Sequence, residues 1–325
     1  MIEGGYVSDW DDIRLYTINA LRRRGVPPGA IVSFVHTVGV TTAMSTIDLT
    51  KFDECIRQYL EPRTPRLMMV LHPIKVTIEN LPEEFLLMVD KPFHPKDPKM
   101  GSNSLPFTRT VYIDSEDFRT TRSKEYLRLV PGGSVGLLYV PRPITCTSFV
   151  ADPNTGDVLH IVCRYEDSGP FVKPKAYIQW VAEHAPSQSP IRVDETRIAR
   201  PLLKSQSPPD EEIMNDIDQN SLEVIPGAVL EVGFTEMAKK ALASARDEAR
   251  VRISSTAVPV DTGVTAITEA QLVGHECVRF QGLRTGYFAL DRDSVIPQLD
   301  DQAGPSSIIL NQIVSLKEDN RKNMK

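Results

Sequence analysis

Hydrophobic residues recur at every third or fourth position over the first sixty residues, which is the period of helices with one buried face. The first predicted helix is capped at Ser8 or Asp9 and ends before Gly25, a residue type favoured just beyond a helix. Two further helices are predicted, one from Pro27 to Gly39 and one from Asp48 to Pro62. The N-terminal segment is therefore expected to be a small helical subdomain.

Beyond residue 66 the hydrophobic period changes from that of a helix to that of short strands. Ile74, Val76 and Ile78 alternate with polar residues, as in a half-buried strand. Strands are also expected within residues 135–150, 158–165, 175–183, 222–234, 275–281 and 286–290, with a turn at 152–156. Many short strands separated by turn signals favour barrels over a parallel sheet.

Two spans have the composition of linkers. Residues 185–212 are rich in Pro and Ser, and residues 236–270 begin with an Ala, Lys, Arg and Glu-rich stretch that could form a helix. Both are expected to be peripheral and partly mobile, and the charged end at 317–325 is expected to fray.

The composition is that of a globular protein with room for two domains. The chain has 325 residues, of which 41% are hydrophobic and 25% charged. It contains no run of about 18 apolar residues and no secretory signal, so no membrane association is expected. The four cysteines are widely spaced and the histidines have no metal-ligand spacing, so a reducing compartment and no metal site are expected.

A net charge of −6 argues against a protein that binds nucleic acid mainly through a broad basic surface. A few well-placed arginines can nevertheless read RNA bases while the rest of the chain stays acidic. The charge therefore leaves RNA recognition open.

Several blocks, in order along nearly the whole chain, resemble the C-terminal portion of the glutaminyl-tRNA synthetases, which are class I enzymes. The two linker-like spans are the exception, and Ile13 stands where that family usually has Pro. The blocks are Trp10–Arg14, Leu21–Gly25, Glu54–Arg57, Pro65–Arg66, Ile74–Asn80, His94–Pro95, Met100–Ser102, Pro106–Phe107, Ile113–Asp114, Asp117–Arg119, Tyr126, Arg128–Leu129, Arg279–Gln281, Arg284, Gly286–Phe288 and Leu290–Asp291.

The resemblance implies an α+β fold with a helical subdomain followed by two barrels of a ribosomal-protein-like kind. The helical subdomain would span residues 1–63, and the proximal barrel residues 64–165 together with 300–325. The distal barrel would span 166–299 and carry the linker-like insertions at 185–212 and 236–270. The return of the chain to the proximal barrel is implied by the resemblance and not by periodicity.

The resemblance also implies anticodon-reading residues. The positions that read the middle anticodon base in the family correspond to Arg66, Gln281 and Arg284, and one position for the third base corresponds to Arg128. Arg offers a planar fork of donors and Gln a donor beside an acceptor, which suits the edges of unpaired bases. The alternative is that these are ordinary surface residues.

Other positions give a weaker indication of RNA contact. The partner of Arg128 in the family is replaced by Leu127, and the wobble-reading arginines of some members are replaced by Gly136 and Leu138. Arg22, Arg23 and Arg24 could contact tRNA phosphates, or they could form a solvated helix end that suits the helix dipole. Both interpretations of the three arginines stay open at this point.

The full-length family attaches glutamine to its tRNA with ATP and Mg²⁺. The His-x-Gly-His and Met-Ser-Lys motifs for that chemistry are absent. Lys99–Ser102 resembles the second motif only in part, because it lacks the second Lys. No phosphate-binding glycine loop is present either. No catalytic residue is assigned. The chain is expected to start just downstream of the catalytic domain and, alone, to bind tRNA without catalysis and without a cofactor of its own.

The expected partners are glutamine tRNA isoacceptors and, in a complex, other synthetases, in the cytoplasm and without DNA or membrane. One alternative is a barrel protein that binds ribosomal RNA. Another is an unrelated enzyme whose site is assembled from residues distant in sequence, which a deep pocket with convergent His, Asp or Glu would favour.

Overall fold

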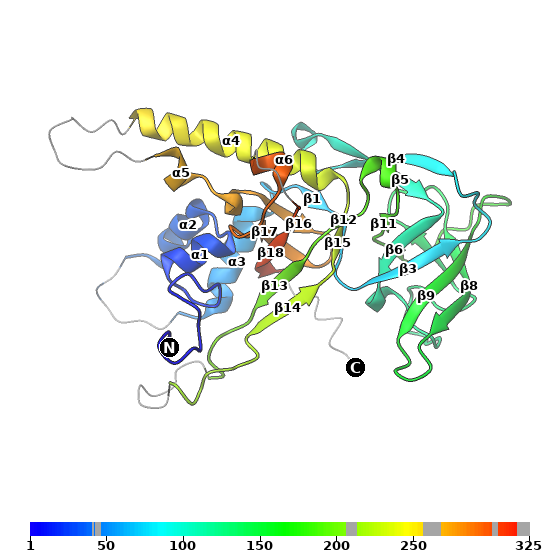
Figure 1. Ribbon diagram of the computed structural model, residues 1–325, viewed down its shortest axis with the longest axis horizontal. Helices are drawn as coiled ribbons and strands as arrows, with labels where there is room; N and C mark the ends of the chain where they lie inside the picture. Colours follow the sequence, from blue (N-terminus) through cyan, green and yellow to red (C-terminus); the bar gives the residue numbers. More distant parts are fainter. Residues whose placement is uncertain (41, 43–46, 206–212, 256–267, 301–304, 317–325) are drawn as a thin grey trace. The chain divides into compact units, whose positions relative to one another are not determined.

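The computed structural model describes the chain except residues 41, 43–46, 206–212, 256–267, 301–304 and 317–325 (Figure 1). The predicted frayed end therefore lies outside the described residues, as do parts of both linker-like spans. The chain forms two compact units. Unit 1 comprises Met1–Pro65, Glu195–Val224 and Glu236–Lys325, and unit 2 comprises Arg66–Asp194 and Ile225–Thr235.

The first part of unit 1 contains the three predicted helices. These are α1 (Ile18–Arg24), α2 (Pro28–Val38) and α3 (Leu49–Leu60). Gly25 ends α1 with φ of 92°, a conformation that favours glycine, and Asp48 caps α3 by accepting a hydrogen bond from the Thr50 backbone N–H. Pro27 and Gly39 flank α2, so the predicted bounds of α2 are confirmed, as are the end of α1 and the start of α3.

The first helix is shorter than predicted and is capped by Thr17, not by Ser8 or Asp9. The Asp12 carboxylate accepts a hydrogen bond from the Ser8 backbone N–H at 3.1 Å and pairs with Arg14 at 2.7 Å. These local bonds hold the preceding residues in turns, because a side chain that bonds its own neighbours competes with helical hydrogen bonding.

Unit 1 also contains a sheet built from distant parts of the chain. Its strands, in spatial order, are β16 (Arg279–Gly282), β17 (Gly286–Leu290), β18 (Ile309–Ser315), β13 (Glu195–Ala199) and β14 (Leu222–Pro226). β16, β17 and β18 are antiparallel, whereas β13 runs parallel to β18. A 3₁₀ turn, η5 (His275–Cys277), precedes β16.

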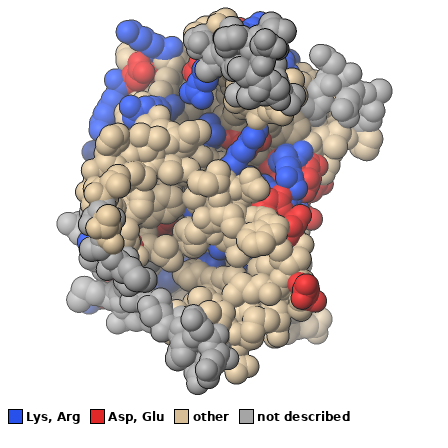
Figure 2. Space-filling view, turned by 90° about the vertical axis from the view of Figure 1, so that its left-hand side faces the viewer, with Lys and Arg blue, Asp and Glu red and all other residues tan. Residues whose placement is uncertain are grey.

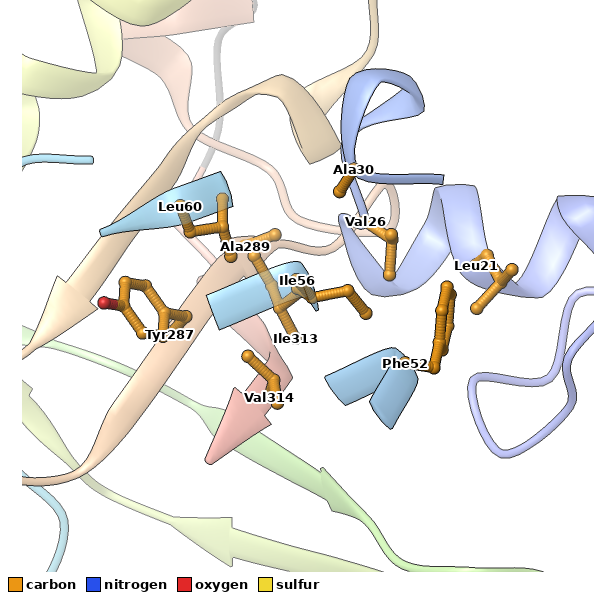
Figure 3. Close-up of a cluster of buried hydrophobic side chains, with 10 residues drawn as sticks. All are labelled: Leu21, Val26, Ala30, Phe52, Ile56, Leu60, Tyr287, Ala289, Ile313 and Val314. Carbon is orange, nitrogen blue, oxygen red and sulfur yellow. The ribbon is translucent and has the colours of Figure 1, made fainter. Parts of the chain in front are cut away.

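The helices and this sheet share one hydrophobic core (Figure 3). Ile56 and Ala289 are fully buried at its centre, with Phe52 toward α1 and Tyr287 on the sheet side. The complete set is Leu21, Val26, Ala30, Phe52, Ile56, Leu60, Tyr287, Ala289, Ile313 and Val314. The helices α1 to α3 and the strands β17 and β18 therefore pack as one body.

The linker-like spans contain regular structure where they are described. Residues 236–270 are largely occupied by α4 (Gly233–Ser255) and α5 (Glu269–Leu272), and residues 185–212 include η3 (Ala185–Ser187), β12 (Ile191–Arg192) and β13. In α4 the buried residues Phe234, Met237, Ala238 and Leu242 follow a helical spacing, which the polar composition hid. A short helix, α6 (Pro297–Asp300), follows later in the chain.

Unit 2 is built mainly of strands. Its largest sheet has, in spatial order, β10 (Tyr177–Ile178), β7 (Ser134–Leu137), β8 (Ile144–Ala151), β9 (Val158–Tyr165), β3 (Pro73–Ile78), β6 (Thr110–Asp114) and β11 (Val181–Ala182). Smaller sheets join β12, β15 (Val229–Leu230) and β2 (Met69–Val70), and β4 (Leu86–Pro92) with β5 (Ser102–Thr108). Two 3₁₀ turns, η1 (Pro98–Met100) and η2 (Ser115–Asp117), and the short strand β1 (Arg66–Leu67) complete the unit.

The predicted alternation in β3 is confirmed, since Ile74, Val76 and Ile78 are buried and Lys75 is exposed. The turn at residues 152–156 joins β8 to β9 as predicted. The α+β class is also confirmed, with sheets consistent with the expected barrels.

The compact units divide the chain differently from the predicted domains. The described strand β18 pairs with β17 and β13 in unit 1, and residues 166–194 belong to unit 2. The assignment of residues 300–325 to the barrel of residues 64–165, and of residues 166–299 to a second barrel, stays a prediction. Ile313 and Val314 of β18 pack in the core of the helical segment, which accounts for the placement of this strand.

Candidate nucleic-acid interface

Gln281 and Arg284 lie on one hairpin of unit 1. Gln281 is in β16, opposite Tyr287, and its backbone N–H donates to the Pro65 carbonyl at 2.8 Å. Only 8% of Gln281 is exposed, and its side-chain Oε1 is buried without a hydrogen-bond partner among the described residues. A buried polar atom without a partner costs roughly 1–3 kcal/mol, so this oxygen needs a hydrogen-bond donor that the described residues do not supply.

Arg284 occupies the turn that follows Gln281. It is exposed, and its φ of 64° lies in the left-handed region that residues other than glycine rarely adopt. The Thr285 backbone N–H donates a hydrogen bond to the Gly282 carbonyl at 3.1 Å, which closes the turn. The hairpin therefore presents a charged donor three residues after a buried amide.

Arg66 begins β1 in unit 2 and is partly buried. Its backbone N–H donates to the Phe93 carbonyl, and its own carbonyl accepts from Lys91 Nζ, each at 2.6 Å. The backbone of Arg66 is thus fixed on both sides. Because Arg66 and the Gln281 hairpin belong to different units, their convergence on one base stays a prediction.

Arg128 lies after a loop of unit 2 and is tied to η2. Its Nη1 atom pairs with Asp117 Oδ1 at 2.8 Å and donates to the Glu116 carbonyl at 3.3 Å. Tyr126 donates its hydroxyl to the same carbonyl at 2.9 Å, and Arg119 lies over the Tyr126 ring. Both contacts of Arg128 use one nitrogen, so a guanidinium with five donors keeps further donors for a base.

The backbone N–H groups of Gly136 and Leu138 are already used in hydrogen bonds. They donate to the carbonyls of Ala176 and Ile178 at 2.9 and 3.0 Å. A Cβ atom at Gly136 would lie 2.4 Å from a Tyr177 ring carbon, so a longer side chain has no room there. Neither the side chains nor these N–H groups can therefore donate to a wobble base.

Arg23 is held inside unit 1 by carboxylates. Its guanidinium pairs with Asp291 at 3.0 Å, with Asp11 at 3.4 Å and with Asp293 at 2.5 Å, and only 13% of its side chain is exposed. Burial alone would raise the pKa of Asp291, but hydrogen bonds from Arg23, the Asp293 N–H and Asn311 hold it below its usual range. Arg23 thus joins α1 to the end of β17.

Arg22 and Arg24 have different environments. Half of the Arg22 side chain is exposed, and it pairs with Glu276 at 2.6 Å. Arg24 is only 6% exposed, with its guanidinium 5.2 Å from the centre of the Tyr16 ring. Of the three arginines, Arg22 is best placed to meet a phosphate. Contact with tRNA stays a prediction for all three.

A cleft of unit 2 has a volume of about 580 Å³. Glu183 in its wall pairs with Lys75 at 3.3 Å and accepts from the Tyr112 hydroxyl, and Glu83 pairs with Arg109 at 3.5 Å. Glu84 and His184 also line the cleft, and His184 Nδ1 lies 2.7 Å from the Ser187 hydroxyl. Among the described residues, no cluster of three His, Cys, Asp or Glu side chains could hold a metal ion, and no helix is long and apolar enough to cross a membrane.

The face displayed in Figure 2 consists mainly of uncharged residues. Lys and Arg form several separate groups on it, some of them beside Asp and Glu. The described residues of this face form no continuous basic surface, so an RNA contact made by them depends on individual side chains.

Residues 64–166 match the model of one protein family, the anticodon-binding domain of class I tRNA synthetases (E and Q). This segment contains Arg66 and Arg128. It also contains most of the strands of unit 2.

The chain is also similar to curated glutamine–tRNA ligases over almost all of its length. It is 43% identical to the glutamine–tRNA ligase protein virJ of Hypocrea virens over 99% of this chain and 44% of that protein. It is 39% identical to a probable glutamine–tRNA ligase of Schizosaccharomyces pombe and 37% identical to the glutamine–tRNA ligase of Saccharomyces cerevisiae. These two matches cover 99% and 98% of this chain, and 37% of each relative. The chain thus spans less than half the length of these relatives.

Proposed function

Because residues 64–166 belong to the anticodon-binding domain family of the class I tRNA synthetases for glutamate and glutamine, we propose that this chain recognises the anticodon of a glutamine tRNA. The choice of glutamine follows the names of the relatives. In this proposal Arg66, Gln281 and Arg284 read the middle base and Arg128 the third base.

The observation that carries the proposal is the buried, unpartnered Oε1 of Gln281 on the hairpin that also presents Arg284. A splayed base offers donors and acceptors on its Watson–Crick edge, so it can satisfy this oxygen and bind the guanidinium at once. An ordinary surface glutamine would be solvated and would not need such a partner.

The test is fluorescence anisotropy of the purified chain with glutamine tRNA and with the same tRNA changed at its middle anticodon base. A good base contact is worth roughly 1–3 kcal/mol, so the change should weaken binding about 5- to 150-fold. Gln281→Ala and Arg284→Ala should each remove most of this discrimination. Exposed residues of unit 1 provide matched controls, Gln58→Ala and Arg246→Ala, which should retain it. Equal binding of both tRNAs by the unaltered chain would refute the proposal.

Only the names of the relatives connect this chain to the attachment of glutamine to its tRNA. Ligation of glutamine uses ATP and Mg²⁺, but the cleft of unit 2 does not suit a triphosphate, because Glu83, Glu84 and Glu183 line it and its Lys75 and Arg109 are paired. We therefore assign tRNA binding, and no ATP chemistry, to this chain. A cytoplasmic location is proposed from an Arabidopsis thaliana relative named glutamine–tRNA ligase, cytoplasmic. Association with other synthetases stays a prediction.

The family match favours anticodon recognition over the two alternatives. A ribosomal-RNA binder would prefer ribosomal RNA to glutamine tRNA in the same anisotropy assay. The cleft gives little support to an unrelated enzyme, because two of its three lining carboxylates, Glu83 and Glu183, are already paired.

A further inference from the structure

Unit 2 contains an ion pair that is almost entirely buried. Lys91 of β4 and Glu231, which follows β15, meet at 3.1 Å between Nζ and Oε1, and their side chains are 1% and 2% exposed. Removing two charges from water is costly, and apolar residues of similar size often stabilise a fold as well or better. Stability alone therefore gives a weak reason for this pair.

Both members of the pair bind the backbone at the start of the unit. Lys91 Nζ donates to the Arg66 carbonyl at 2.6 Å. Glu231 Oε2 accepts from the Met68 N–H at 2.8 Å, and the Glu231 N–H donates to the Met68 carbonyl at 3.2 Å. The pair thus holds residues 66 to 68 at both ends.

Several donors surround the Glu231 carboxylate. Burial raises the pKa of Glu231, while Lys91, the Met68 N–H and Asn103 act in the opposite direction. Tyr139 also lies near Arg66 and Glu231, and burial raises its pKa. An ammonium with three donors can serve the carboxylate and the Arg66 carbonyl together, which a neutral apolar side chain cannot.

We propose that Lys91 and Glu231 are positioning residues for Arg66, which set the direction in which its side chain leaves the backbone. The inference rests on the proposed function, in which Arg66 reads the middle anticodon base. A base contact tolerates errors of only about 0.5 Å and 10–20°, and the long Arg side chain magnifies any rotation of its own backbone. Loosening residues 66–68 therefore weakens discrimination between bases more than it weakens overall tRNA binding.

The test uses the whole chain with glutamine tRNA and the variant tRNA changed at its middle base. Lys91→Met removes the donor to Arg66 but leaves Glu231 buried and unpaired. The paired variant Lys91→Met/Glu231→Gln removes both charges and keeps an oxygen for the Met68 N–H, so it is the variant expected to fold. Discrimination between the two tRNAs should fall from about tenfold or more to below about threefold in this variant.

A matched control removes partly buried hydrogen bonds elsewhere in unit 2. Asn80 bonds the N–H and carbonyl of Tyr165, each at 2.8 Å, and contacts neither residue 66 nor residue 68 by a described hydrogen bond. Asn80→Ala should lower the urea midpoint and leave the ratio of the two tRNA affinities unchanged. Combining the paired variant with Arg66→Ala should cause no further loss of discrimination.

The outcomes separate this inference from the proposed function. If the unaltered chain does not distinguish the two tRNAs, the proposed function fails. If the unaltered chain distinguishes them and Arg66→Ala abolishes the difference, while the folded paired variant keeps it, the positioning role is overturned. Equal loss in Asn80→Ala and the paired variant would also overturn it, because a general loss of stability would then explain both.

Discussion

Replacing Arg23 by Met should destabilise unit 1 severely, because it leaves a buried carboxylate without its main partner. The Asp291 side chain is fully buried and pairs with Arg23 at 3.0 Å. Breaking a buried pair by removing one partner costs about 3–5 kcal/mol. Asn311 and Arg197, the latter 3.7 Å from Asp291, remain to bind the carboxylate, so the lower end, about 3 kcal/mol, is expected.

Arg22→Met is the matched comparison, since it removes the neighbouring charge from the same helix. The Arg22 side chain is half exposed and pairs only with Glu276 among the acidic groups described near it. Its partner Glu276 is buried, with 7% of its side chain exposed, so loss of this half-exposed pair should cost about 1–2 kcal/mol. The two substitutions should therefore differ by about 1 kcal/mol or more.

Urea and thermal unfolding measure the difference. For a unit of this size each kcal/mol lowers Tm by about 2–4 °C, so Arg23→Met should lower Tm by about 6–12 °C. If Arg22 contacts a phosphate, Arg22→Met should reduce the slope of the logarithm of the tRNA binding constant against the logarithm of the salt concentration by about one. Arg23→Met should leave this slope unchanged. Equal urea midpoints for the two variants would show that the buried network does not carry the stability assigned to it here.

Three further perturbations test the packing and the charges. Ile56→Ala, at a fully buried position of the shared core, should cost about 2–5 kcal/mol in urea unfolding, and a change below about 1 kcal/mol would contradict that core. Gly25→Ala should lower stability by about 2–4 kcal/mol in a thermal melt, because φ is 92° and the new Cβ would lie 2.2 Å from Ala289 Cβ. An unchanged melting temperature would exclude this close approach. Asp12 has a pKa of about 2, since hydrogen bonds from Arg14 and Ser8 outweigh the effect of burial. A lowered folded-state pKa stabilises the protein above about pH 4, and about 1–2 kcal/mol from Asp12 should disappear as the pH falls from 4 to 2; Asp12→Asn should abolish this part of the acid dependence.

Helix ends were predictable where the signal lies within a few residues. Asp48 caps α3 and Gly25 ends α1 because each role depends on the conformation of one residue and its neighbours. The start of α1 was not predictable in this way. Asp12 has the same local signal as a residue of a first helical turn, yet its bonds to Ser8 and Arg14 hold it in a turn.

Strand positions followed from the period of hydrophobic residues, but strand partners did not. The sequence of β18 does not reveal that Ile313 packs near Ile56, because a strand of the same pattern would also fit the barrel of residues 64–165. Composition was misleading in α4, where many polar residues cover one face and the buried Met237 and Leu242 lie on the other.

The candidate site was predictable only through family resemblance. Gln281 and Arg284 occur near each other in sequence, but nothing in the pattern indicates that the Gln281 amide oxygen is buried. Lys91 and Glu231 had no signal at all, because they are far apart in sequence and each resembles an ordinary surface charge until the fold joins them.

The acidic net charge is compatible with RNA recognition, because several arginine side chains form ion pairs within the protein. Arg23 is surrounded by Asp11, Asp291 and Asp293, and Arg128 is paired with Asp117. Cations already neutralised within the protein release few counterions from RNA, so affinity should depend on base contacts more than on phosphate contacts. Such a protein gains its discrimination from a few fixed donors and acceptors, and its tRNA binding should weaken only modestly as salt is raised.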